Sequence, residues 1–269
     1  MARRTPRGVL TLAGVSCSAF LALGALSVVP AGAASATPRA AVGPAYTFLN
    51  PPDGTDPTFV TRWNPCAPIR VGVDTAYLKT RGIKVKKEVA RIRSVVREAA
   101  KVSGYSMVFK GRVDNQAYFE DAATSSDPQF PDLVSGAYSA AGGLDIVITY
   151  ARDSGAGAYT YPAFSSGAWG YGEAFGATNH VPGSSQIAIK AYQGSVVLNA
   201  NGIKQSLRQN RPGQIRNLYL HELGHALGLG HTTNYRQVMY PSVRNTVTHY
   251  RAGDRAGLRA LESAPCFSS

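Results

Sequence analysis

The chain has 269 residues, of which 44% are hydrophobic, and a formal net charge of +12. This length and apolar content suffice for one domain with a sizeable core, so no second domain is required. Apart from four arginines within the first 39 residues, the basic residues spread from Arg62 to Arg259 without a basic-aromatic binding motif, which argues against a nucleic acid as partner. General solubility, or attraction to an anionic cell surface, explains the charge better.

The first 36 residues have the pattern of a secretory signal peptide. Three early arginines precede an apolar run from Val9 to Val29, and two Ala-x-Ala sites follow at residues 31–33 and 34–36. The run is long enough to span a bilayer, so a retained membrane anchor is the alternative. We expect a secreted, extracellular protein, with cleavage near residue 36 and an irregular lead-in over residues 37–62; the pattern does not distinguish general secretory from twin-arginine export.

The first half of the remaining chain predicts a strand, a helix and two further strands. Apolar and polar residues alternate over residues 69–74, as in a strand with one buried face. Residues 84–102 have helical periodicity, and Gly104 supplies the stop. Further strands are predicted at 105–110 and at the nearly all-apolar segment 144–150. This order indicates a βαβ unit and a mainly parallel sheet.

The second half begins with a loop and a pair of strands. Residues 151–167 are rich in glycine, serine, alanine and tyrosine, which is typical of a loop. Strands are predicted over residues 168–176 and 186–191, with a turn around Pro182 and Gly183 between them. A helix should then run from about Arg211 to Leu227, and a last helix from about Gly253 to Leu261.

The helix that begins near residue 211 carries the most specific motif of the chain, H-E-x-x-H-x-x-G-x-x-H. His221 and His225 are four residues apart, so they share one helix face and can bind one metal ion. Gly228 allows a turn through positive φ that brings His231 back to the same ion. Three ligands leave one position of a tetrahedral Zn²⁺ for water, and Glu222 can take a proton from that water. The alternative is a helix with surface histidines, but three of only five histidines fall in this window.

Two cysteines remain once the signal peptide is removed. An even pair in an exported protein favours a disulfide between Cys66 and Cys266 over two free thiols. The bridge would tie the two ends of the folded chain together.

The sequence Val238-Met239-Tyr240-Pro241, downstream of the third histidine, resembles the Met-turn of metzincins, and its Met-Tyr-Pro order resembles the matrixin branch. The resemblance implies an α/β (α+β, metzincin-like) fold. Its mixed, mainly parallel twisted sheet would have an antiparallel edge strand, a long backing helix, an active-site helix and a small C-terminal subdomain. We therefore expect a catalytic domain over 63–269, with an upper subdomain at 63–228 and a lower one at 229–269.

The resemblance also implies where substrate would lie. The edge strand above the cleft would be Gly172-Glu173-Ala174-Phe175, and Met239 would lie beneath the zinc. Helical periodicity places Asn217 one turn before His221, as a candidate for the pocket that receives the side chain after the scissile bond. The segment just past Met239 would form the opposite wall, with these residues: Tyr240, Pro241, Ser242 and Val243.

The sequence departs from vertebrate-type matrixins in two respects. Residues 151–183 contain only three metal-binding candidates, Asp153, Glu173 and His180, which are too few for a second, structural zinc. Calcium held by backbone carbonyls has no support in the sequence. No cysteine precedes Trp63 in the mature chain to silence the zinc, as the propeptide cysteine of matrixins does.

These features predict a secreted, monomeric zinc-dependent endopeptidase with one catalytic Zn²⁺ and a protein or peptide substrate. His221, His225 and His231 would bind the metal and Glu222 would act as general base. Two alternatives stay open: a secreted zinc-binding or interaction protein with little or no catalysis, and a zinc hydrolase of a non-protein amide.

Overall fold

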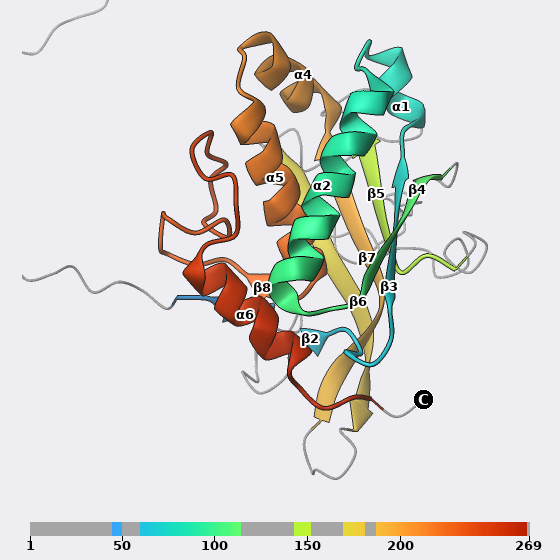
Figure 1. Cartoon of the computed structure of the whole chain (residues 1–269), viewed down its shortest axis with the longest axis vertical. Helices are drawn as coiled ribbons and strands as arrows, with labels where there is room; N and C mark the ends of the chain where they lie inside the picture. The colour runs from blue at the N-terminus through green and yellow to red at the C-terminus, as the bar shows by residue number, and fades with distance from the viewer. Residues whose placement is uncertain (1–44, 50–59, 114–142, 152–168, 181–186, 268–269) are drawn as a thin grey trace, which may run out of the picture. The chain divides into compact units, whose positions relative to one another are not determined.

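A computed structural model describes residues 45–49, 60–113, 143–151, 169–180 and 187–267. Its main feature is a six-stranded mixed sheet in the order β2-β7-β5-β3-β4, with β6 paired to β7 (Figure 1). All neighbours along this order are parallel, whereas β6 is antiparallel to β7. The strands are β2 (Thr61–Arg62), β3 (Ile69–Asp74), β4 (Met107–Val113), β5 (Ile146–Ala151), β6 (Gly170–His180) and β7 (Ile187–Asn199).

Five helices accompany the sheet in the described parts of the chain. They are α1 (Ala76–Thr80), α2 (Val85–Ser103), α4 (Ala200–Arg208), α5 (Pro212–Ala226) and α6 (Ala252–Glu262). Figure 1 shows α2 and α5 side by side across one face of the sheet, with α6 against the C-terminal end of α2. The mixed sheet, the antiparallel β6 and the two long helices confirm the predicted fold class.

The hydrophobic pattern explains why these elements form where they do. β5 is buried along its whole length, because it lies between β3 and β7 and under the helices. α2 buries Ile92, Val96 and Ala99 at helical spacing and ends at Gly104, whose φ of 99° few other residues adopt.

The structure departs from the sequence prediction between residues 192 and 210. β7 does not end at Ala191 but continues to Asn199, and α4 follows at once, with the Asn199 side chain accepting from Asn201 N and Gly202 N as its cap. The prediction ended early because Gly194 interrupts the apolar pattern. Glycine is needed there, because a Cβ would lie 2.9 Å from Ile146 and 3.1 Å from the Trp63 ring.

The expected irregular lead-in also contains paired strands. β1 (Thr47–Phe48) pairs antiparallel with β8 (Leu229–Gly230), and β2 joins the main sheet beside β7. Strands of two residues have no periodicity of their own and form only because a partner strand is present.

Cys66 and Cys266 form a disulfide with their Cα atoms 5.6 Å apart. It joins the turn after β2 to the segment after α6. No helix in the described ranges is long and apolar enough to cross a membrane. The expected signal peptide, the loop at 152–167 and the turn around Pro182 and Gly183 lie outside the described residues.

Candidate active site

The active-site helix α5 is placed by its two ends. Pro212 occupies its first turn, where a missing N–H costs nothing. At the other end Gly228 has φ of 106°, and a Cβ there would overlap the carbonyl oxygen of Thr61. Glycine therefore lets the chain turn sharply into β8. β1 holds that strand, and Thr47 Oγ1 donates to the carbonyl of His231, so the lead-in helps to fix the third histidine.

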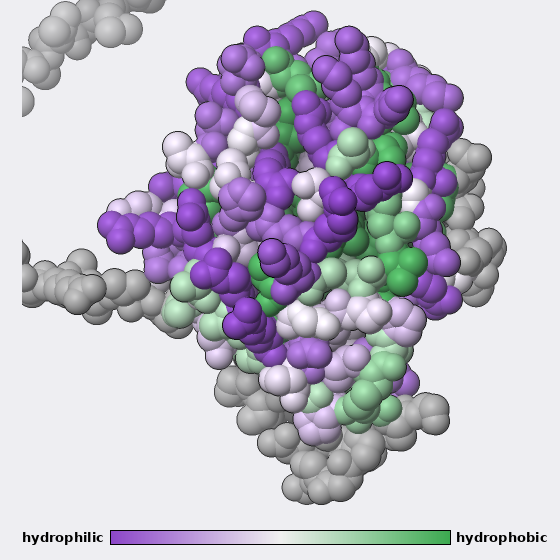
Figure 2. Space-filling view, in the orientation of Figure 1, coloured by the Kyte–Doolittle hydropathy of each residue, from purple (hydrophilic) through white to green (hydrophobic). Residues whose placement is uncertain are grey.

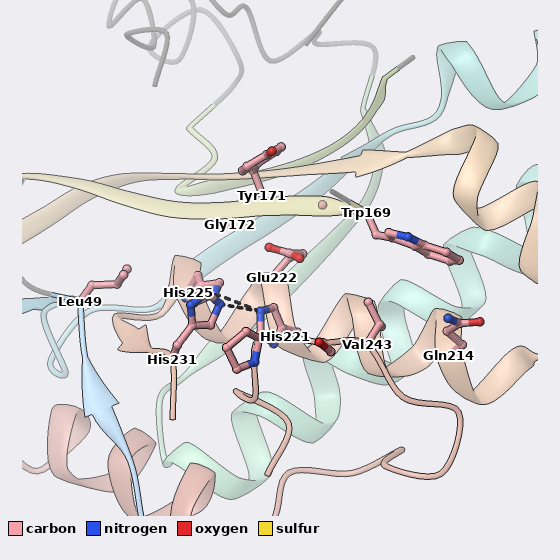
Figure 3. A pocket seen from close by; sticks show the side chains of 13 residues that line it. Leu49, Trp169, Tyr171, Gly172, Gln214, His221, Glu222, His225, His231 and Val243 are labelled. Atoms are coloured by element: carbon pink, nitrogen blue, oxygen red, sulfur yellow. Dashed lines mark hydrogen bonds between the residues drawn. The ribbon is translucent and has the colours of Figure 1, made fainter. Parts of the chain in front are cut away.

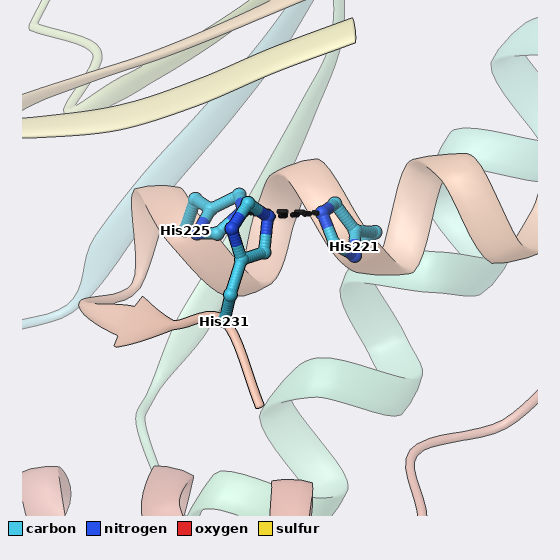
Figure 4. A group of neighbouring side chains, drawn as sticks. All are labelled: His221, His225 and His231. Atoms are coloured by element: carbon cyan, nitrogen blue, oxygen red, sulfur yellow. Dashed lines mark hydrogen bonds between the residues drawn. The ribbon is translucent and has the colours of Figure 1, made fainter. Parts of the chain in front are cut away.

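The structure brings the three predicted histidines together (Figure 4). Their Nε2 atoms lie 3.1 Å (His225 to His221), 3.1 Å (His225 to His231) and 3.2 Å (His221 to His231) apart. Two ligand nitrogens on one tetrahedral zinc are expected about 3.3 Å apart, given bonds of ~2.0–2.1 Å. The donor set and its spacing thus fit a zinc ion.

The other ring nitrogens fix the orientation of the first two histidines. Nδ1 of His221 lies 2.8 Å from the carbonyl oxygen of Val238, and Nδ1 of His225 lies 2.7 Å from that of Leu229. A proton on each Nδ1 leaves the Nε2 lone pair free for a metal. Burial lowers the pKa of His221 to about 4 and also lowers the pKa values of His225 and His231, so the rings stay neutral, as metal ligands must.

Met239 packs directly against the active-site helix. It is buried, and a Cβ at Gly224 would overlap its sulfur, so the glycine between the two helical histidines permits this contact. The turn is also held by Asp254, whose carboxylate accepts from Val238 N (2.9 Å) and Met239 N (3.2 Å). Burial raises the pKa of Asp254, and these N–H donors oppose the rise. Sequence reasoning missed Asp254, which had no signal beyond its position early in α6.

Glu222 lies beneath the edge strand β6 (Figure 3). Its side chain is 5% exposed, and burial raises its pKa to about 8. A Cβ at Gly170 would lie 2.7 Å from Glu222 Cγ, and a Cβ at Gly172 would overlap the Glu222 carbonyl. Two glycines at strand spacing therefore let the edge strand approach the helix at Glu222.

A pocket of about 640 Å³ opens over the histidines and Glu222 (Figure 3). Of the expected substrate residues, it is lined by Gly172, Pro241, Ser242 and Val243. Glu173, Ala174 and Phe175 pair with β7 as part of the edge strand. Sequence reasoning missed the remaining lining residues, which are Leu49, Trp169, Gly170, Tyr171 and Gln214.

Asn217 and Tyr240 are not among the residues that line this pocket. Asn217 is 1% exposed; its Nδ2 donates to the carbonyl of Val247 (2.8 Å) and its Oδ1 accepts from Arg244 N (2.9 Å). The segment after the Met-turn thus covers the Asn217 amide, and Asn217 holds this segment in place.

Replacing Asn217 with leucine should therefore destabilise the protein by about 1–3 kcal/mol, because the buried Val247 carbonyl and the part-buried Arg244 N–H lose their partner. Urea unfolding measures the effect. Gln205→Leu, at an exposed position on α4, is the matched control and should change stability little. Equal stability of the parent and the Asn217 variant would contradict the anchoring role.

A second anchor holds the same segment further along. Glu98 on α2 accepts from Tyr250 N and His249 Nδ1, both at 2.9 Å, and pairs with Arg216. Arg216 in turn donates from Nε to the carbonyl of Thr248 (2.8 Å). The segment that forms the pocket wall is thus fixed to both α2 and α5.

Comparison with known proteins adds one finding. The matrixin family model (Peptidase_M10) matches residues 143–262, from just before β5 to the end of α6. This range contains all three histidines, Glu222 and Met239. No curated protein matches the sequence significantly.

Proposed function

We propose that this chain is a secreted zinc-dependent endopeptidase of the matrixin type. The matrixin family model over residues 143–262 and the three-histidine group support the proposal. The observation that carries the proposal is the convergence of three Nε2 atoms at the floor of an open pocket that also contains Glu222. A closed structural zinc site would need a fourth protein ligand, whereas the metal-binding group of the described residues has three.

His221, His225 and His231 would hold the zinc. When bound, zinc would act as a Lewis acid toward the scissile carbonyl and the attacking water. Glu222 would take a proton from that water and later give a proton to the leaving amine. Burial under β6 raises the pKa of this carboxyl to about 8, and the positive charge of a bound Zn²⁺ would lower it again, which would keep Glu222 able to accept a proton.

The edge strand and the pocket walls support a polypeptide substrate. β6 pairs with β7 on one side only among the described strands, so an extended peptide could add to its other edge. Trp169, Val243 and Pro241 give the pocket an apolar lining, with Gln214 as a polar group. Leu, Phe or Tyr should therefore be accepted better than acidic residues after the scissile bond.

Two observations support secretion. The first 36 residues have a signal-peptide pattern, and the Cys66–Cys266 disulfide suits an oxidising compartment. No cysteine lies between Thr37 and Trp63 to block the zinc, so no thiol-modifying activator should be needed.

The mature protein from Thr37 should cleave a mixed peptide library, lose that activity with a chelator and regain it with Zn²⁺. Mass spectrometry of the products detects the cuts and also reads the preference after the scissile bond. Zinc binding without any cleavage would favour a non-catalytic zinc protein. Cleavage that persists after complete zinc removal would overturn the proposal.

A further inference from the structure

A second pocket, with a volume of about 560 Å³, lies between two loops and the start of α6. Residues 234–237 line it from before the Met-turn, Arg244, Thr246 and Val247 line it from after the Met-turn, and Arg251 and Ala252 line it at the start of α6. In Figure 1 these loops are drawn in orange-red beside α6. Three arginines line the pocket, Arg236, Arg244 and Arg251, and no part of the metal site does. Of the ion pairs that the described residues form, none involves these three side chains.

The acidic group closest in sequence, Asp254, does not neutralise the pocket. It is 1% exposed and does not line the pocket, although the charge of Arg251 acts on it. Its oxygens accept from the backbone N–H groups of Val238, Met239 and Arg251. The pocket is therefore cationic without a matching carboxylate from the described chain.

Two of the guanidinium groups are held by tyrosines. Arg244 lies over the rings of Tyr235 and Tyr240, at 5.1 Å from each centroid, and Arg236 lies over Tyr235 at 5.6 Å. Arg236 Nε also donates to the Tyr235 hydroxyl (3.3 Å). Stacking uses the guanidinium face and leaves N–H groups at the edge, which bind carboxylates in a fork geometry. Ala252, the first residue of the 11-residue helix α6, adds the positive end of a helix dipole.

The two pockets share one wall. Val243 lines the catalytic pocket, and the next residue, Arg244, lines the cationic one. Asn217 binds the backbone at Arg244 and at Val247, and both of these residues line the cationic pocket. A polypeptide that occupies the catalytic pocket can therefore continue past Val243 toward the three arginines.

We infer that this pocket binds an acidic segment of the polypeptide substrate, on the far side of the Val243 wall from the zinc site. That the bound segment belongs to a substrate rests on the proposed endopeptidase function. That the pocket binds an acidic segment does not. Three separate cations in a pocket of this volume suit a segment with several carboxylates better than one small anion.

Binding is tested with the Glu222→Ala form of the mature protein, which should not cleave the probe. Fluorescence anisotropy of a labelled peptide with six consecutive glutamates should report binding roughly ten-fold tighter than that of the all-glutamine peptide, and the difference should vanish near 1 M salt. Arg236→Gln and Arg251→Gln should each weaken binding roughly three-fold or more. Arg97→Gln, an exposed position on α2, is the matched control and should bind like the parent.

Three results would overturn the inference: unchanged binding in both pocket variants, an equal loss in Arg97→Gln, or binding of inorganic phosphate without binding of the peptide.

A cleavage experiment then tests whether the ligand is part of the substrate. Two substrates with one scissile segment, followed downstream by glutamates or by glutamines, should differ at least about five-fold in kcat/KM with the parent, and the ratio should fall toward 1 in the pocket variants. A parent that cleaves neither substrate would refute the endopeptidase function while the anisotropy result stands. Equal cleavage of both would refute an acidic substrate segment.

Discussion

Replacing Glu222 with alanine should lower turnover by at least about 100-fold, because general acid-base catalysis contributes typically 10²–10⁴-fold. The change leaves all three histidines in place, and it leaves the carbonyl groups that bind Nδ1 of His221 and of His225. One zinc per molecule should therefore remain. Metal analysis and kcat on the same preparation test both parts of the expectation. Glu222→Gln, which keeps the size of the side chain without its basicity, should lose as much.

The matched control is Glu262→Gln, at the C-terminal end of α6 and not among the residues that line the pocket over the histidines. Its position is not that of a proton-transfer group in the proposed mechanism, so an equal loss in this variant would point to a general charge effect. A Glu222 variant that turns over at the parent rate would exclude the general-base role. One that loses its zinc would show instead that the carboxyl supports the metal site.

The histidine cluster was predictable because its geometry is almost entirely local. The four-residue spacing of His221 and His225 fixes their relative position on any helix, and Gly228 supplies the one turn that a side chain would block. More distant residues refine this geometry: the Val238 carbonyl orients His221, and Thr47 and β1 hold the strand before His231. The three-histidine group therefore follows mainly from eleven consecutive residues, with support from the Met-turn and the lead-in.

The pocket was less predictable because distant segments assemble it. Leu49 and Trp169 are far apart in the sequence, and neither stands in a pattern that marks a site. One signal was available: Gly170 and Gly172 are two apart, so they leave one face of a strand without side chains. That spacing could have indicated a close approach to another element, here α5 at Glu222.

Asn217 shows where periodicity stops being informative. A helix position gives the direction of a side chain but not what lies opposite, and the loop after the Met-turn had no predictable path. The backbone N–H of Arg244 and the carbonyl of Val247 bind the side-chain amide of Asn217, so this amide is not available to bind substrate. The same holds for α4 and the end of β7, where tertiary packing around Gly194 outweighs local propensity.

Replacing both Cys66 and Cys266 with alanine should lower the free energy of unfolding by up to about 5 kcal/mol. The disulfide closes a loop of 200 residues, so it removes a large amount of entropy from the unfolded chain. For a domain of this size, that loss corresponds to a melting temperature lower by roughly 10–20 °C. Urea unfolding and thermal melting of the parent and the double variant measure it, and the parent in excess reductant should match the variant.

Activity should survive this change at temperatures where the variant stays folded, because neither cysteine is among the residues that line the pocket over the histidines. The tail after α6 also keeps a contact of its own, since Asn64 Oδ1 accepts from Phe267 N (3.3 Å) as well as from Cys66 N (3.2 Å). Asn64→Ala in the disulfide-bonded protein is therefore the matched control, and it should cost only about 0.5–1.5 kcal/mol. If the reduced and oxidised parent unfold at the same urea concentration, the bridge does not stabilise the fold. Residual structure in the unfolded chain must then already remove the conformational entropy that the bridge would otherwise remove.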